Sequence, residues 1–213
     1  MKMKPNVNKA ALIVAVLAVQ CVAIGWLIWR YEDIVRNGIE VRLKCSAYDP
    51  SDPFRGRYLR VEVSEECDNL LERVDGRAWE IHSRHNNGVF AELEQSTNGL
   101  WRVAAVADSP KDDGGVWIKP KRVQVEHSVR WANRSAGESY KDFAKRRDAS
   151  PLMAIVSMPD QLFMNEHLAS VAEEALRKAV AQYGKGAVAV YRVKDGEIVI
   201  TDVEIGGKSV SCL

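Results

Sequence analysis

The sequence predicts a mainly β protein of the α+β class that is held to a membrane by one N-terminal helix. Two observations predict this class. From residue 39 onward, short runs alternate apolar and polar residues, which is the period of a half-buried strand. An unbroken apolar run at 10–29 precedes them. We therefore expect a transmembrane helix, then an antiparallel β-rich extracytoplasmic domain with one packed amphipathic helix at 166–183.

The apolar run at 10–29 has the length and composition of a transmembrane helix. Gln20 is its only strongly polar residue. About 20 helical residues span roughly 30 Å, which is the thickness of the hydrocarbon core of a bilayer. Trp26, Trp29 and Tyr31 gather at one end, where interfacial aromatic residues lie. We expect this run to bind the lipid bilayer.

The charges around the apolar run predict its direction. Three lysines precede the run, and the first acidic residue of the chain is Glu32. Basic residues favour the cytoplasmic side of a membrane, so residues 1–9 are expected in the cytoplasm. Residues 30–38 are expected to be a connector, with a short helical continuation that Asn37-Gly38 ends. Residues 39–213 are then the domain outside the cytoplasm.

Two other interpretations of the apolar run are a cleaved signal peptide and a buried helix of a soluble protein. A signal peptide has a shorter apolar region and a small-x-small cleavage site after it. Arg30-Tyr31-Glu32, which follows Trp29, offers no such site. A buried helix usually has an amphipathic stripe, which this run lacks. The sequence therefore favours an uncleaved signal anchor.

The charge of the chain argues against a nucleic-acid partner. The chain has 30 basic and 29 acidic residues, and without the three N-terminal lysines 27 bases stand against 29 acids. Proteins that bind nucleic acids usually carry a basic patch or stripe. We expect no nucleic-acid partner.

Alternating runs predict the strands of the domain. The first two are expected at 39–44 and 58–63. A hairpin is expected from 78–83 and 89–94, because the Asn-Asn-Gly at 86–88 supplies the positive φ angles of a tight turn. Further strands are expected at 101–106, 116–119, 122–126, 187–191 and 198–203.

Residues 166–183 are expected to form the packed helix. Asn165 can cap its start and Gly184 can end it, and leucine, valine and alanine residues recur on one face. Residues 130–147 are polar, basic and weakly patterned. They are expected to be a surface excursion or the junction between two lobes that divide near 130–150.

The segment 49–58, Asp-Pro-Ser-Asp-Pro-Phe-Arg-Gly-Arg-Tyr, predicts a shaped loop. Its two Asp-Pro steps disfavour helix and remove backbone donors, so it is neither a helix nor a central strand. Shaped loops on rigid scaffolds often carry binding or catalytic groups. The candidate binding residues are Asp49, Asp52, Phe54, Arg55, Gly56 and Tyr58, with Glu166 at the start of the predicted helix.

A catalytic role for this loop is the alternative to a binding role. Asp49 and Asp52 lie near Arg55 and Arg57, and paired carboxylates can do acid–base chemistry when their pKa values differ. Aspartates before proline more commonly cap turns, and exposed ion pairs contribute about 0 to 1 kcal/mol. We expect no catalytic residue. A membrane-anchored hydrolase or small-ligand receptor centred on 49–58 remains the alternative, and a spacer without a ligand is a third hypothesis.

The cysteines allow at most one internal disulfide. Cys21 lies in the apolar run, which leaves Cys45, Cys67 and Cys212. Cys45 and Cys67 are the nearest pair, although a simple hairpin would place Cys45 opposite Tyr58. There is no Cys-x-x-Cys and no close Cys/His pair, so neither a metal nor another cofactor is expected.

The residues from Tyr48 to Tyr58 resemble the signature of the GDYXXLXY family, membrane-anchored bacterial proteins of unknown function named for that motif. The order of later elements also fits, and the resemblance covers roughly 39–210. It departs from the motif at Arg57, where the family has aspartate, and at Val61 and Val63, where it has leucine and tyrosine. Because Arg57 reverses the charge, no role of that carboxylate carries over.

The resemblance also implies a setting and a class of partner. It implies a Gram-negative cell, an inner membrane crossed once by the chain, and a periplasmic domain in the bacterial envelope. Members of the family often accompany polytopic inner-membrane proteins, so it implies protein–protein interaction without an established activity. The leading hypothesis is a non-enzymatic accessory module for such a partner.

Overall fold

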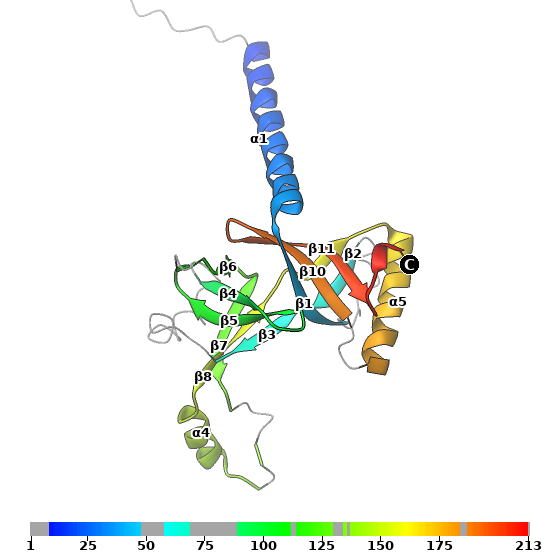
Figure 1. Ribbon diagram of the computed structural model, residues 1–213. Coiled ribbons are helices and arrows are strands. Elements are labelled where there is room, and N and C mark those ends of the chain that lie inside the picture. The colour runs from blue at the N-terminus through cyan, green and yellow to red at the C-terminus, as the bar shows by residue number, and fades with distance from the viewer. Residues whose placement is uncertain are drawn as a thin grey trace, which may run out of the picture.

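The fold is a long N-terminal helix joined to a β-rich body. The computed structural model describes residues 9–47, 58–68, 89–111, 114–129, 134–135, 137–183 and 187–212. Helix α1 (Lys9–Asn37) stands away from the body over most of its length (Figure 1). The predicted α+β class, with an apolar N-terminal helix and antiparallel sheets, is confirmed.

Three antiparallel sheets make up the described part of the body. The largest has the strand order β12-β11-β10-β1-β2-β9, and the two smaller ones have the orders β3-β8-β7 and β5-β4-β6. The strands of the largest sheet are β1 (Ile39–Ala47), β2 (Tyr58–Glu62), β9 (Gln161–Phe163), β10 (Ala187–Lys194), β11 (Glu197–Ile205) and β12 (Lys208–Ser209). The other strands are β3 (Ser64–Cys67), β4 (Phe90–Gln95), β5 (Trp101–Ala107), β6 (Val116–Ile118), β7 (Arg122–His127) and β8 (Leu152–Ser157).

The alternating patterns have a direct structural cause. Successive side chains of a strand point to opposite faces, and in β1 the apolar positions Val41, Leu43 and Cys45 are all buried. These residues belong to a hydrophobic core that draws on all three sheets. The strands predicted at 39–44, 58–63, 89–94 and most later runs are confirmed, whereas the predicted strand 78–83 and the turn at 86–88 lie outside the described residues.

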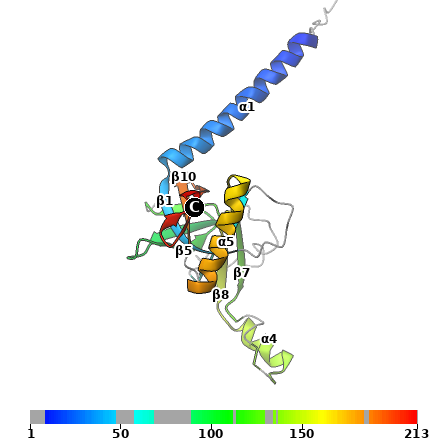
Figure 2. The same ribbon diagram turned by 90° about the vertical axis from the view of Figure 1, so that its right-hand side faces the viewer.

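Helix α5 (Glu166–Tyr183) has the predicted bounds and packs on β1 and β2 (Figure 2). Its inner face carries Ala172 and Leu176, which are fully buried. On its outer face Lys178 pairs with Glu174 at 2.7 Å, and both side chains are more than half exposed. Such a pair contributes about 0 to 1 kcal/mol, so burial of the apolar face holds α5 in place.

The described part of the domain holds two helical elements besides the predicted packed helix. Helix α4 (Tyr140–Asp148) begins within 130–147 and ends one residue beyond it, and a short 3-10 helix, η2 (Val210–Cys212), follows β12. Ser139 caps α4 by accepting a hydrogen bond from the Lys141 amide at 3.3 Å, and Phe143 is fully buried. In Figures 1 and 2, α4 lies at the end of the body opposite α1. The division into two lobes near 130–150 stays a prediction.

Tyr191 of β10 ties two of the sheets together. Its side chain is fully buried, and its hydroxyl donates to the carbonyl oxygen of Pro159 at 2.8 Å. Pro159 lies between β8 and β9, and the neighbouring Met158 amide donates to the Val63 carbonyl at 3.0 Å. The connection between β8 and β9 therefore joins the largest sheet to the β3-β8-β7 sheet.

Candidate functional site

The predicted binding loop is only partly within the described residues. Asp49, Asp52, Phe54, Arg55 and Gly56 lie outside them. Their role as binding residues stays a prediction.

The backbone brings the other two candidate binding residues, Tyr58 and Glu166, toward the same end of the largest sheet. Tyr58 begins β2 and pairs with Phe163 of β9, which lies three residues before Glu166, the first residue of α5. The end of the predicted loop and the start of α5 are therefore neighbours along the backbone. The side chains of Tyr58 and Glu166 are not among those described.

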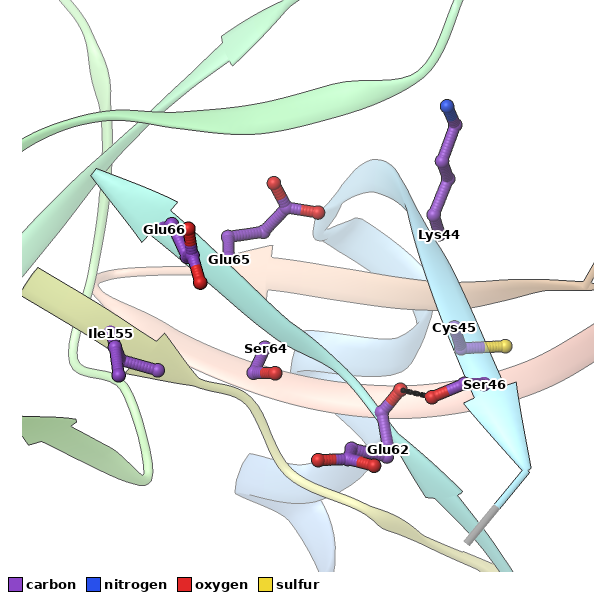
Figure 3. Close-up of a pocket in the computed structure, with 8 residues that line it drawn as sticks. All are labelled: Lys44, Cys45, Ser46, Glu62, Ser64, Glu65, Glu66 and Ile155. Atoms are coloured by element: carbon purple, nitrogen blue, oxygen red, sulfur yellow. Dashed lines mark hydrogen bonds between the residues drawn. The ribbon is translucent and has the colours of Figure 1, made fainter. Parts of the chain in front are cut away.

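An open cavity of about 610 Å³ lies where β1 diverges from β2 and β3 (Figure 3). It arises because β1 and β2 pair only at Ser46 with Glu62 and at Ala47 with Val61. The Ser46 hydroxyl also donates to the Glu62 carbonyl at 3.5 Å. The lining residues are Lys44, Cys45, Ser46, Glu62, Ser64, Glu65, Glu66 and Ile155.

The lining of this cavity includes the buried thiol of Cys45. Burial raises the pKa of the Cys45 thiol to about 12, so it stays protonated and weakly nucleophilic at neutral pH. Among the described residues, no group of three or more His, Cys, Asp or Glu side chains could hold a metal ion.

The structure records no disulfide between Cys45 and Cys67, and both side chains are buried. The pairing of Ser46 with Glu62, when continued, places Cys45 beside Val63 and not opposite Tyr58. Cys67 is four residues further along, roughly 13 Å at the rise of an extended strand. A disulfide needs Cα atoms within about 7 Å of each other.

A second candidate site is the junction between α1 and the β10-β11 hairpin, which we call the junction. From Ala11 to Glu32 every residue of α1 is exposed, but Ile34 retains only 5% exposure because it packs on the body. The Gly38 amide donates to the Ile34 carbonyl at 2.9 Å and ends the helix. A Cβ atom on Gly38 would lie 2.4 Å from that carbonyl oxygen and 3.1 Å from the backbone nitrogen of Val193. Only glycine fits at this crossing.

Ion pairs flank the apolar contact of the junction. The Lys194 ammonium lies 2.5 Å from the Asp33 carboxylate, and Arg30 pairs with Glu197. Lys194 and Glu197 stand on either side of the β10-β11 turn, so the two pairs hold both ends of that turn against α1. Arg192 adds hydrogen bonds to the Gly38 carbonyl at 3.2 Å and to Glu40 at 2.9 Å. Together these contacts fix the direction of α1 relative to the largest sheet.

Sequence reasoning missed the junction. It predicted the helical continuation to Asn37 and the end at Gly38, and both are confirmed. The partners of α1, however, lie about 160 residues later in the chain, as with Lys194 and Asp33, which are 161 positions apart. The available signal was Gly38 itself, because a glycine between a helix and a strand marks a close backbone approach.

Asp160 forms a second cluster that sequence reasoning missed. Its carboxylate accepts hydrogen bonds from Lys121 at 2.5 Å and from Arg60 at 3.1 Å, and its carbonyl accepts from the Val61 amide at 3.0 Å. Partial burial acts to raise the pKa of Asp160, but the hydrogen bonds from Lys121 and Arg60 and the charge of Lys121 outweigh it and lower that pKa. Asp160 therefore joins β2 to the connection between β6 and β7 as a structural cluster.

Replacing Asp160 with asparagine should lower the free energy of unfolding by about 1 to 3 kcal/mol at pH 7, because the partly buried Arg60 and the more exposed Lys121 lose their carboxylate partner. The lowered pKa means that the carboxylate stabilises the fold above its ordinary value of 3.8 and loses that effect as the pH falls through its folded value. The difference between the two proteins in denaturant unfolding should therefore shrink in acid. Glu94→Gln, at an exposed pair with Arg102, is the control. An equal effect of both substitutions would contradict this role for Asp160.

Helix α1 is the one described helix that is long and apolar enough to cross a membrane, with a candidate span of Ala11–Asn37. None of its most apolar window is buried in the body. The Arg30 guanidinium lies 5.3 Å from the centre of the Trp26 ring, at the end of the apolar run. This cation–π contact places a charge and an aromatic ring together where the helix meets the body.

The comparisons with known proteins identify the same family as the motif. The family described as GDYXXLXY protein matches residues 20–203, most of the chain, from within α1 to β11. The search of curated proteins and the search of solved structures each gave no match. Because the match includes part of α1 and nearly the whole body, the chain belongs to the GDYXXLXY family, whose function is unknown.

Proposed function

We propose that this protein is anchored in the inner membrane by α1, with its N-terminus in the cytoplasm and its β-rich body in the periplasm. In this proposal the body is a non-enzymatic accessory module that binds a polytopic membrane protein. The observation that carries the proposal is the junction, in which Ile34, Gly38 and two ion pairs join the anchor to the largest sheet.

A fixed junction supports a docking role over a simple tether. A flexible linker would be enough to keep a domain near a membrane, and it would leave the domain free to turn. A partner that contacts both the membrane helix and the body benefits when their relative direction is already set, because less conformational freedom is lost on binding. Every residue from Ala11 to Trp29 is exposed in the structure, and in this proposal lipids or a partner's helix cover these side chains.

Co-purification tests this function. The full chain is isolated from membranes in mild detergent, and the proteins that accompany it are quantified by mass spectrometry. The proposal predicts recovery of a polytopic membrane protein in near-stoichiometric amount. A matched variant keeps residues 30–213 and replaces 11–29 with an unrelated apolar helix of equal length, which shows whether the helix or the body recognises the partner. Recovery of no membrane protein, under conditions that preserve other membrane complexes, would contradict the proposal.

A further inference from the structure

We propose that the β10-β11 turn, Asp195-Gly196, is a lipid-contacting surface that lies in the headgroup layer of the membrane that α1 spans. This inference rests on the membrane anchoring in the proposed function and adds a contact that the anchor alone does not require. It follows from the depth of the residues that hold the turn, from the stiffness of the junction and from the charges around it.

The depth follows from the positions of the ion pairs along α1. Trp29 ends the apolar run, Arg30 follows it directly, and Asp33 lies four residues beyond Trp29. At a rise of about 1.5 Å per residue, Asp33 lies about 6 Å past the end of the run. A tilted helix would bring Asp33 closer to the hydrocarbon core than this. The headgroup region extends roughly 5 to 8 Å on each side of the hydrocarbon core. The pairs from Arg30 to Glu197 and from Asp33 to Lys194 therefore bring both ends of the turn into this layer.

The turn cannot swing away from α1 without losing these contacts. It is a tight connection, since Asp195 and Gly196 both have positive φ angles, 51° and 79°, and link the paired residues Lys194 and Glu197 directly. A Cβ atom on Gly38 would lie 3.1 Å from the backbone of Val193, so the helix end and β10 are in close backbone contact. Figure 1 shows the turn end of this hairpin on the side of the body from which α1 leaves.

A second connection is held at the same surface. The Lys119 amide, directly after β6, donates to the Gly196 carbonyl at 2.7 Å. The side chain of Lys119 is exposed, as is that of Asp195. The turn and the connection after β6 therefore form one membrane-side rim, defined here as Lys119 with Asp195 and Gly196.

The charges of this rim fit zwitterionic headgroups. Around it, Lys194 and Glu197 are paired with α1, and Lys121 is paired with Asp160. The exposed charges of the rim itself, Lys119 and Asp195, are opposite in sign. A polybasic surface would bind anionic lipids with about 1 kcal/mol for each basic residue. This rim has no such excess, so its depth is set by α1 and should not depend on anionic lipid or on salt.

Fluorescence quenching in nanodiscs tests the depth. In the full chain, Cys21→Ala and Cys212→Ser remove the exposed thiols, and the buried Cys45 and Cys67 are kept. Asp195→Cys then adds a thiol for the fluorescent label. The same chain without Asp195→Cys measures residual labelling. Lys141→Cys, on α4 at the opposite end of the body, is the matched site. In phosphatidylcholine nanodiscs with a headgroup nitroxide, the label at 195 should be quenched several-fold more than the label at 141, with or without anionic lipid.

The outcomes separate this inference from membrane anchoring. A chain with only Cys212→Ser is labelled at Cys21, inside the span, and an acyl-chain nitroxide should quench that label. If Cys21 is quenched but 195 and 141 respond equally, the inference fails and the anchor stands. If Cys21 is not quenched, both fail. If the label at 195 is quenched only when anionic lipid is present, the proposed contact with zwitterionic headgroups is wrong. The chain is separated from any co-purifying protein before it is placed in nanodiscs, so quenching at 195 cannot come from a partner that carries the turn to the membrane.

Discussion

Replacing Gly38 with valine should release α1 from the β10-β11 hairpin while the body stays folded. The added Cβ atom would lie 2.4 Å from the Ile34 carbonyl oxygen and 3.1 Å from the backbone of Val193, so the helix end must shift. Forcing extra atoms into a packed site typically costs about 1 to 3 kcal/mol. Amide hydrogen exchange should therefore become faster at Gly38 and in the hairpin, and recovery of the partner should fall.

Gly25 provides a matched control for this substitution within the same helix. A Cβ atom on Gly25 would meet nothing within 4 Å, so Gly25→Val adds the same side chain without a clash. It should leave exchange in the hairpin unchanged. If Gly38→Val also leaves that exchange unchanged, the junction is not rigid, and the docking role loses its main support.

Truncating Tyr191 to alanine should be the most destabilising substitution considered for the body, at about 3 to 5 kcal/mol. The side chain is fully buried in β10, between β1 and β11, and its removal leaves a cavity in the core shared by the sheets. Tyr191→Phe retains the ring and removes only the hydrogen bond to Pro159, which should cost about 1 kcal/mol. Denaturant unfolding of the full chain in detergent measures both values.

The comparison of the two Tyr191 variants separates packing from hydrogen bonding. Val171→Ala on α5 is the control for loss of an apolar side chain, because Val171 is half exposed and its truncation should change stability little. Equal losses for Tyr191→Phe and Tyr191→Ala would show that the hydrogen bond, and not burial of the ring, holds this part of the fold. A loss at Tyr191→Ala no larger than at Val171 would place Tyr191 outside the core.

Local patterns predicted those parts of the fold that have one buried face. β1 alternates because Val41, Leu43 and Cys45 face the core while the residues between them are not buried, and α5 has an apolar stripe because one side packs on the sheet. β8 was missed because its sequence, Leu-Met-Ala-Ile-Val-Ser, is apolar almost throughout and shows no alternation. α4 was missed because Phe143 is its one buried residue in a polar, basic segment.

The candidate sites were harder to predict than the strands. The junction and the Asp160 cluster depend on contacts between residues far apart in the chain, such as Arg60 with Asp160 at a separation of 100 positions. The helix and strand periods of the sequence carry no information about such distant contacts. The family could be identified from the sequence because its motif lies within about ten consecutive residues, and the family match confirms this identification. The functional role of residues 49–57 stays a prediction.

The fate of the apolar run in cells is the most direct test of the account, because both the junction and the proposed docking require α1 to stay attached to the body. Membranes are washed with carbonate at high pH, and peptides of the chain in the pellet and in the soluble fraction are identified by mass spectrometry. We predict that the chain stays in the pellet and still contains residues 11–29. A soluble chain that begins after Trp29 would show that this run is a cleaved signal sequence, and it would contradict the account.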